Sequence, residues 1–334
     1  MVNMAKWLQD WKSARAKKSM PILSFPAIAQ LGITVKDLIA SPDAQARGMK
    51  AIADRCPTAA SVGMMDLSVE AEAFGSVIKV SEDEVPTVIG RLLESEEDVD
   101  NLRVPPPTSG RTGLYIQAIR QALGLITDRP VFAGAIGPFS LAGRLMDVTE
   151  IMVNCLTEPE MVHKTLEKVS EFTTSYILEY KKIGAHGVVM AEPAAGLLSP
   201  DLNAEFSARY VKRIRDAVRD DHFLFIYHNC GKTLPLVQSL MSIQADGYHF
   251  GNAIDLEDML KIVPEDVLVM GNIDPSSHFR LGTPEKMRRA VLDLLARCGK
   301  YPNFCISSGC DIPPLSPWTN IDAFFAAIAE HYGV

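Results

Sequence analysis

The stretch Phe223-Leu-Phe-Ile-Tyr-His-Asn-Cys-Gly231 is an apolar run that ends in a histidine, a spacer and a cysteine. A similar run, Gly187-Val-Val-Met-Ala191, precedes it, and Asn203–Val218 between them carries apolar and charged residues at helical spacing. Neither run alternates strictly between apolar and polar residues, as expected of parallel strands that are buried on both faces. This part of the chain therefore predicts a strand, a helix and a second, parallel strand.

The same pattern recurs along the chain. Strands are predicted at Pro21–Phe25, Ala59–Met64, Val131–Ala135, Gly187–Ala191, Phe223–Tyr227, Gly247–Phe250, Val267–Gly271 and Asn303–Ser307. Helices are predicted at Ser109–Leu123, Glu158–Lys182, Asn203–Val218, Thr283–Arg297 and Ile321–His331. Eight strands that alternate with helices favour a (β/α)8 barrel, or TIM barrel, as a single domain over residues 1–334. A doubly wound open sheet is the alternative, but the sequence lacks the glycine-rich turn that usually marks that fold.

Two segments depart from this alternation. Residues 1–18 spread basic side chains between Trp7, Leu8 and Trp11, which predicts an amphipathic helix ahead of the barrel. The segment Asp66–Pro107 contains the proline-rich stretch Val104-Pro-Pro-Pro107 and many acidic residues. We expect it to form an elaborated loop after the second strand, with a hairpin and a helix that cover the barrel mouth.

The composition argues against several classes of protein. Acidic residues outnumber basic ones, 41 to 33, and this net charge of −8 argues against nucleic-acid binding. The longest uncharged run, Ser19–Val35, is interrupted by Pro21 and Pro26, so it is a poor candidate for a membrane span. Six cysteines in a chain of this length, with no convincing export signal, indicate reduced thiols. We therefore expect a cytoplasmic protein.

Three potential metal ligands follow predicted strands. His228 and Cys230 follow the fifth strand and Cys310 follows the eighth, and a barrel places the loops after these strands over the same mouth. Side chains two positions apart on an extended chain project to the same side, so His228 and Cys230 can share one cation. Imidazole and thiolate ligands suit zinc, and three protein ligands leave a fourth position open. Glu192, after the fourth strand, is a candidate for that position in the resting enzyme.

The neighbouring cysteines and histidines are better explained by packing. Cys305 lies inside a predicted strand and is expected to be a small core residue. His249 lies on an apolar strand and is expected to be an interior histidine with satisfied hydrogen bonds. A cysteine nucleophile at Cys230 is an alternative to a metal site, but no second histidine is placed to act as its base.

The ligand set indicates a kind of chemistry. Two thiolates donate much charge, so zinc held by one histidine and two cysteines is poorly suited to activating water. It is well suited to holding an incoming thiol as a thiolate at neutral pH, because a coordinated thiol loses its proton. The sequence therefore predicts alkyl transfer to sulfur in preference to hydrolysis.

Motifs spread over the chain from about Phe25 to its end resemble those of a known superfamily. They are Met65–Gly75, Gly134–Ala142, Met190–Pro193, His228–Gly231, Gly271–Pro275 and Ser308–Pro314, followed by Asn320-Ile321. These motifs are similar to those of the uroporphyrinogen decarboxylase superfamily. The His-x-Cys and the later Gly-Cys resemble those of its zinc-dependent methylcobamide:coenzyme M methyltransferases.

The resemblance implies a TIM barrel with zinc at its mouth, held by His228, Cys230 and Cys310, with Glu192 as an additional ligand. It implies transfer of a methyl group from a methylated corrinoid (a methylcobamide), carried on a separate corrinoid protein, to a small zinc-activated thiol such as coenzyme M.

Four residues on the family motifs are expected to line the cavity. Glu192 and Asp66 are the expected catalytic carboxylates, and Asn272 and Asp274 are the expected substrate-binding residues. Helix caps and hydrogen bonds that fix loops explain Asp66, Asn272 and Asp274 nearly as well.

Two other functions remain open at this point. A decarboxylase of the porphyrinogen type needs no metal, but such enzymes bind substrate propionates through an arginine-containing stretch near the N-terminus. Here Lys18–Leu31 contains no arginine, which argues against a substrate with many carboxylates. A non-catalytic partner of a corrinoid protein, in which zinc only ties loops together, is the other alternative.

Overall fold

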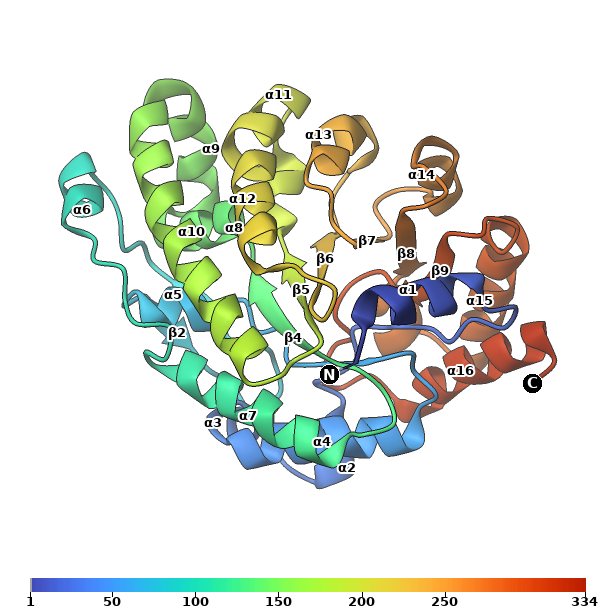
Figure 1. Cartoon of the computed structure of the whole chain (residues 1–334). Helices are drawn as coiled ribbons and strands as arrows, with labels where there is room; N and C mark the ends of the chain where they lie inside the picture. Colours follow the sequence, from blue (N-terminus) through green and yellow to red (C-terminus); the bar gives the residue numbers. More distant parts are fainter. Residues whose placement is uncertain (1) are drawn as a thin grey trace.

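A computed structural model describes residues 2–334 and shows a curled sheet of parallel strands with helices around it (Figure 1). The strands of this sheet are β1 (Ser61–Val62), β4 (Val131–Ile136), β5 (Gly187–Ala191), β6 (Leu224–Asn229), β7 (Gly247–Phe250), β8 (Leu268–Ile273) and β9 (Phe304–Ser308). Each strand pairs in parallel with the next one in this order. The arrangement is that of a (β/α)8 barrel, which confirms the predicted fold class.

The prediction of a strand at Pro21–Phe25 was wrong. This segment is irregular, because Pro21 has no N–H group to donate to a sheet ladder. Isolated hydrogen bonds hold the segment beside the two edges of the sheet. Among them, the Ser307 hydroxyl donates to the Met20 carbonyl at 2.8 Å, and the Ala59 N–H donates to the Ser19 carbonyl at 2.8 Å. The segment therefore fills the eighth strand position between β9 and β1.

The predicted helices are present with slightly shifted ends. All the helices that surround the sheet or precede it, predicted or not, are α1 (Met4–Ser13), α2 (Ala27–Leu31), α3 (Val35–Ala40), α4 (Pro42–Arg55), α7 (Arg111–Leu125), α10 (Pro159–Lys182), α11 (Pro200–Asn203), α12 (Arg209–Val218), α13 (Val237–Ser242), α14 (Leu256–Ile262), α15 (Pro284–Cys298) and α16 (Trp318–Tyr332). The predicted helix over 203–218 is partly different, because Ala204–Ala208 form a π-helical turn, η2. Between these helices lie two 3-10 turns, η1 (Pro193–Leu197) and η3 (Leu234–Leu236), and a second π-helical turn, η4 (Pro275–Arg280).

Helix α15 shows why a helix begins where the sequence predicts it. Thr283 caps the helix by accepting a hydrogen bond from the Lys286 N–H at 3.3 Å, and Pro284 occupies the first helical position. That position needs no N–H donor, and the fixed φ of proline suits it.

Extra elements follow β1 and β4 on the side of the barrel where the strands end. After β1 come α5 (Val69–Ala73), an antiparallel hairpin of β2 (Val77–Lys79) and β3 (Thr87–Ile89), and α6 (Glu96–Asn101). After β4 come α8 (Pro138–Met146) and α9 (Val148–Thr157). The Glu70 carboxylate on α5 accepts a hydrogen bond from the Ile136 N–H at 2.9 Å, which ties α5 to the end of β4. The expected hairpin and helix after the second predicted strand are therefore confirmed.

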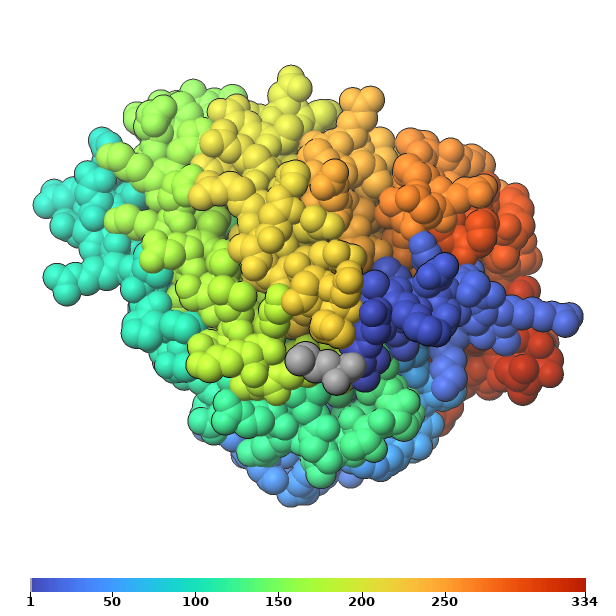
Figure 2. Space-filling view, in the orientation of Figure 1, coloured from blue at the N-terminus to red at the C-terminus, as the bar shows by residue number. Residues whose placement is uncertain are grey.

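Apolar residues form two separate buried clusters. The smaller one contains side chains from six strands of the sheet, among them Phe132, Ile226 and Met270, and fills the barrel interior. The larger one lies between the sheet and the surrounding helices. The predicted N-terminal helix, α1, places Trp11 against the interior cluster and closes the end of the barrel opposite the mouth. Figure 2 shows this segment in dark blue, packed between the yellow and red parts of the chain.

None of the helices described in residues 2–334 combines the length and the apolar character needed to cross a membrane.

Candidate metal centre

His228 lies in β6 and faces the barrel interior. Leu224 and Ile226 on the same strand belong to the interior cluster, and side chains on one face of a strand recur every second residue. His228 continues this face at the end of the strand, so its imidazole lies above the apolar interior and is only 2% exposed.

Cys230 is positioned by the residues on either side of it. The Asn229 side chain donates to the Glu192 carbonyl at 2.7 Å and accepts from the Gly231 N–H at 2.8 Å, which fixes the turn that carries Cys230. Gly251, just after β7, allows this turn to approach closely, because a Cβ atom there would lie 2.6 Å from the Cβ of Cys230.

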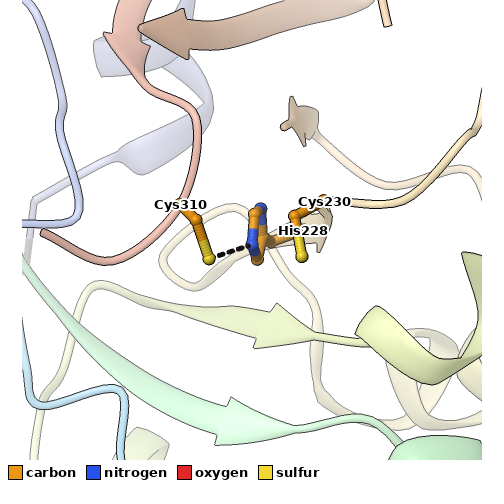
Figure 3. A group of neighbouring side chains, drawn as sticks. All are labelled: His228, Cys230 and Cys310. Atoms are coloured by element: carbon orange, nitrogen blue, oxygen red, sulfur yellow. Dashed lines mark hydrogen bonds between the residues drawn. The ribbon is translucent and has the colours of Figure 1, made fainter. Parts of the chain in front are cut away.

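Cys310 reaches the same place from the loop after β9. The Gly309 N–H donates to the Ile273 carbonyl at 2.6 Å, and the Ile312 N–H donates to the Ile22 carbonyl at 3.0 Å. The Cys310 sulfur lies 3.4 Å from Nε2 of His228, and one ligand atom from each of His228, Cys230 and Cys310 lies within 4.8 Å of the others. Figure 3 shows the three side chains pointing toward one another. Among residues 2–334 this is the one such group of histidine, cysteine and carboxylate side chains.

The two thiols of this group ionise unequally. The hydrogen bond from Cys310 and the contact with His228 lower the pKa of the Cys230 thiol. The same contact with Cys230, together with burial, raises the pKa of Cys310. The group thus offers an easily formed thiolate, a second thiol and an imidazole at one point, and this donor set fits a tetrahedral zinc site with one position left for a substrate.

Glu192, the predicted fourth ligand, lies outside this close group. Its carboxylate is fully buried and accepts hydrogen bonds from the N–H groups of Phe139 and Ser140, both at 2.8 Å, and from the Ser207 hydroxyl at 3.1 Å. Burial raises its pKa to about 7. These contacts place the carboxylate at the N-terminus of α8, where a negative charge is favourable. Its role as a zinc ligand or catalytic group stays a prediction.

Asp66, the other predicted catalytic carboxylate, is held by a buried ion pair. One carboxylate oxygen accepts from the Ser68 N–H at 3.0 Å and the Ser68 hydroxyl at 2.6 Å. The other pairs with the guanidinium of Arg111 and accepts from the Tyr115 hydroxyl at 2.9 Å. Both oxygens are thus occupied by neighbouring donors, which is the loop-fixing role considered as the alternative.

Asn272 and Asp274, the predicted substrate-binding residues, also hold loops. The Asn272 side chain donates to the carbonyls of Gly251 and Ile254 at 2.9 and 3.0 Å. The Asp274 carboxylate accepts from the N–H groups at the start of η4 at 2.8 and 3.0 Å. Contact of either residue with a substrate stays a prediction.

His249 and Ser307 lie beside this site, although nothing in their local sequence indicates it. His249 is buried, as expected, but its ring lies edge-on to that of His228, with 4.7 Å between the ring centroids. The signal that could have found it is the pairing of β6 with β7, which sets His228 beside His249. Arg111 was also missed, because nothing in its local sequence points to Asp66.

Three comparisons relate the chain to known proteins. A family model described as "Uroporphyrinogen decarboxylase (URO-D)" matches residues 23–331. Two proteins named "Methylcobamide:CoM methyltransferase MtbA", from Methanosarcina acetivorans and Methanosarcina mazei, are 25% and 26% identical to the chain, with 95% of the chain and 96% of each relative covered. A "Uroporphyrinogen decarboxylase" from a Synechococcus species is 30% identical over 254 residues, which covers 72% of the chain and 69% of that protein.

Among solved structures, one titled "methyltransferase from Methanosarcina mazei" superposes with a TM-score of 0.86. The match covers 99% of this chain and 100% of that one, at 20% sequence identity. At this level of identity the likeness supports the fold alone.

Proposed function

The chain belongs to the uroporphyrinogen decarboxylase family, and on this premise we propose that it is a zinc-dependent methyltransferase that moves a methyl group from a methylated corrinoid to a thiol. The observation that carries the proposal is the meeting of His228, Cys230 and Cys310 at the barrel mouth. The two Methanosarcina relatives, which match along nearly the whole chain, support the same reaction.

His228, Cys230 and Cys310 are the residues that hold the zinc in this proposal. When bound, zinc lowers the pKa of a coordinated thiol, so that the acceptor sulfur is a nucleophile at neutral pH. The protein's own contribution is placement. The apolar cluster fills the barrel below His228, and Cys230 and Cys310 are partly exposed, so both substrates approach from the mouth. Positioning of the sulfur in line with the methyl group then supplies much of the rate.

The acceptor that we propose is a small anionic thiol such as coenzyme M. Arg144 is the one residue of α8 that is not buried, and α8 lies on the mouth side of β4. Its guanidinium has no hydrogen bond or ion pair with any of residues 2–334. Partial burial lowers its pKa, and the charge of the Asp66 carboxylate acts in the opposite direction. A guanidinium without a partner suits a sulfonate or carboxylate on the acceptor.

The methyl donor that we propose is a corrinoid carried by a separate protein that docks on the mouth. Leu197, Leu281 and Leu315 are exposed leucines on the loops after β5, β8 and β9. Large apolar patches on a surface are typical of a contact with another protein, and the loops that carry these leucines lie at the same end of the barrel. We also propose a reducing, cytoplasmic location, with which the six free cysteines are consistent. The seven parallel strands form one sheet, which supports our proposal of a single domain.

The test is to incubate the zinc-loaded protein with free methylcobalamin and follow the loss of the methyl–cobalt absorbance. We expect demethylation with 2-mercaptoethanesulfonate, slower demethylation with uncharged 2-mercaptoethanol, and none after zinc is removed by a chelator. Arg144→Gln should raise KM for the sulfonate more than for mercaptoethanol, whereas the exposed control Arg120→Gln should change neither. The absence of thiol-dependent demethylation by the zinc-loaded protein would refute the proposal.

A second candidate is tetrapyrrole decarboxylation, which the Synechococcus relative favours. The same purified protein can be incubated with uroporphyrinogen and its products examined for lost carboxyl groups. We expect no decarboxylation, because Lys18–Leu31 offers no arginine to bind the propionates.

A further inference from the structure

His249 and Ser307 form a chain of hydrogen bonds that ends on His228. Nε2 of His249 lies 2.7 Å from the Ser307 hydroxyl oxygen, and Nδ1 of His249 lies 2.7 Å from Nδ1 of His228. All three side chains are buried, so water does not compete for these bonds. They come from β6, β7 and β9, three different strands of the barrel.

The position of each proton follows from the hydrogen bond between Ser307 and Met20, at the end of the row that lies farthest from His228. The Ser307 hydroxyl has one hydrogen and donates it to the Met20 carbonyl at 2.8 Å, because a carbonyl can only accept. The hydroxyl oxygen therefore accepts from Nε2–H of His249. A neutral His249 with its proton on Nε2 has a bare Nδ1, which accepts the proton of His228 Nδ1–H.

The contacts of His228 itself, at the other end of the row of hydrogen bonds, independently place the proton on the same nitrogen. Nδ1 of His228 also lies 3.0 Å from the backbone carbonyl of His249, and this carbonyl can only accept a hydrogen bond. Nδ1 of His228 must then carry the proton. The lone pair is left on Nε2, the nitrogen that faces Cys310 at 3.4 Å.

We propose that His249 and Ser307 are positioning residues that fix His228 as the Nδ1–H tautomer and so present its Nε2 lone pair to the zinc. The inference rests on the proposed function in that His228 is taken as a zinc ligand. The sequence of bonds, Met20 carbonyl to Ser307 to His249 to His228, also fixes the ring plane, because each bond restrains the next side chain. Second-sphere partners of this kind typically contribute about 10- to 100-fold to metal affinity.

The first measurement is made without metal, on protein labelled with ¹⁵N-histidine. We expect the ¹⁵N chemical shifts of His228 to show a protonated Nδ1 and a bare Nε2 in the wild-type chain. His249→Phe keeps an aromatic ring and the backbone carbonyl at 3.0 Å but removes the shorter bond of 2.7 Å to Nδ1 of His228, so we expect the Nδ1–H tautomer to remain the major form while a measurable share of the Nε2–H tautomer appears. A wild-type His228 that carries its proton on Nε2 would overturn the inference.

The second measurement is the zinc dissociation constant, determined by competition with a chromophoric chelator. We expect His249→Phe to raise it about 10- to 100-fold and Ser307→Ala to raise it less. His249→Asn places an amide oxygen near the position of Nδ1, so it should recover part of the affinity lost in His249→Phe. An unchanged zinc affinity in a folded His249→Phe variant would also overturn the inference.

Two controls separate this role from general destabilisation. Ser308→Ala removes the acceptor of the Ile22 N–H, a bond of 3.1 Å between β9 and the same N-terminal segment, and leaves the Ser307–His249 hydrogen bond in place. His331→Asn changes an exposed histidine on α16. Neither should alter the His228 tautomer or the zinc affinity. Because both readouts are independent of methyl transfer, a chain that shows the expected tautomer and zinc affinities but transfers no methyl group would refute the proposed function and leave this inference standing.

Discussion

Nε2 of His228 and the sulfur of Cys310 lie 3.4 Å apart, although the two residues belong to β6 and to the loop after β9. Zinc binding at this point requires both loops, so we expect Cys310→Ala to abolish stoichiometric zinc binding and methyl transfer. Zinc content can be measured by elemental analysis of the purified variant. Cys298→Ala, which removes a buried cysteine of α15, is the matched control and should keep its zinc. Full activity in a zinc-free Cys310→Ala variant would contradict the proposed site.

Glu192 contributes to stability through the N-terminus of α8. Glu192→Gln replaces an accepting oxygen by an NH₂ group that faces backbone N–H donors, so it should lower the free energy of unfolding by about 1–3 kcal/mol. Since the carboxylate lies outside the His228, Cys230 and Cys310 group, we expect the zinc content to be unchanged. Urea unfolding and elemental analysis check the two parts, with exposed Glu205→Gln as the control. Loss of zinc from a folded Glu192→Gln variant would instead establish Glu192 as a ligand.

The buried carboxyl group of Glu70 makes stability depend on pH. Burial raises its pKa from the ordinary value of 4.5 to about 7. Between these two values the folded protein keeps a proton that the unfolded chain releases, so the contribution of Glu70 to the free energy of unfolding falls as the pH rises. Glu70→Gln lacks this titration but can still accept the hydrogen bond from Ile136.

We therefore expect Glu70→Gln to gain stability relative to the wild type by up to about 3 kcal/mol between pH 4.5 and pH 7, with no further gain above pH 7. Urea unfolding at several pH values measures the difference, and Glu97→Gln, an exposed change on α6, should show none. A gain that appeared only above pH 8 would be inconsistent with Glu70 as the cause.

Leu281 is a sensitive probe of the proposed carrier docking, because it is 76% exposed and directly follows η4 on the mouth side of the barrel. Leu281→Glu should raise KM about tenfold for a methylated corrinoid protein, since it places a charge in an apolar contact, and leave KM for free methylcobalamin unchanged. Ile262→Glu, an exposed apolar position at the end of α14, should affect neither. An equal effect of Leu281→Glu on both donors would place Leu281 in the corrinoid pocket instead of the docking surface.

Much of the architecture could be predicted because strand and helix signals are local. Local sequence is enough to recognise the strands at Val131–Ala135 and Gly187–Ala191 and the helix start at Thr283-Pro284. All three are found where expected. The run at Pro21–Phe25 shows the limit of this reasoning. Its hydrogen bonds depend on Ser307 and Ala59, which lie far away in the sequence.

The sequence by itself determined the TIM-barrel fold class and singled out His228, Cys230 and Cys310 as candidate ligands, because strand and helix patterns are local and the strand ends of a barrel share one mouth. Only the tertiary structure decided which neighbours these groups have. It turned the Glu192 carboxylate toward the N-terminus of α8, paired Asp66 with Arg111, and set His249 and Ser307 behind His228. The physical reason is that side-chain periodicity is a property of each strand alone, whereas hydrogen-bond partners depend on strand register and on the paths of loops that pack from distant parts of the chain.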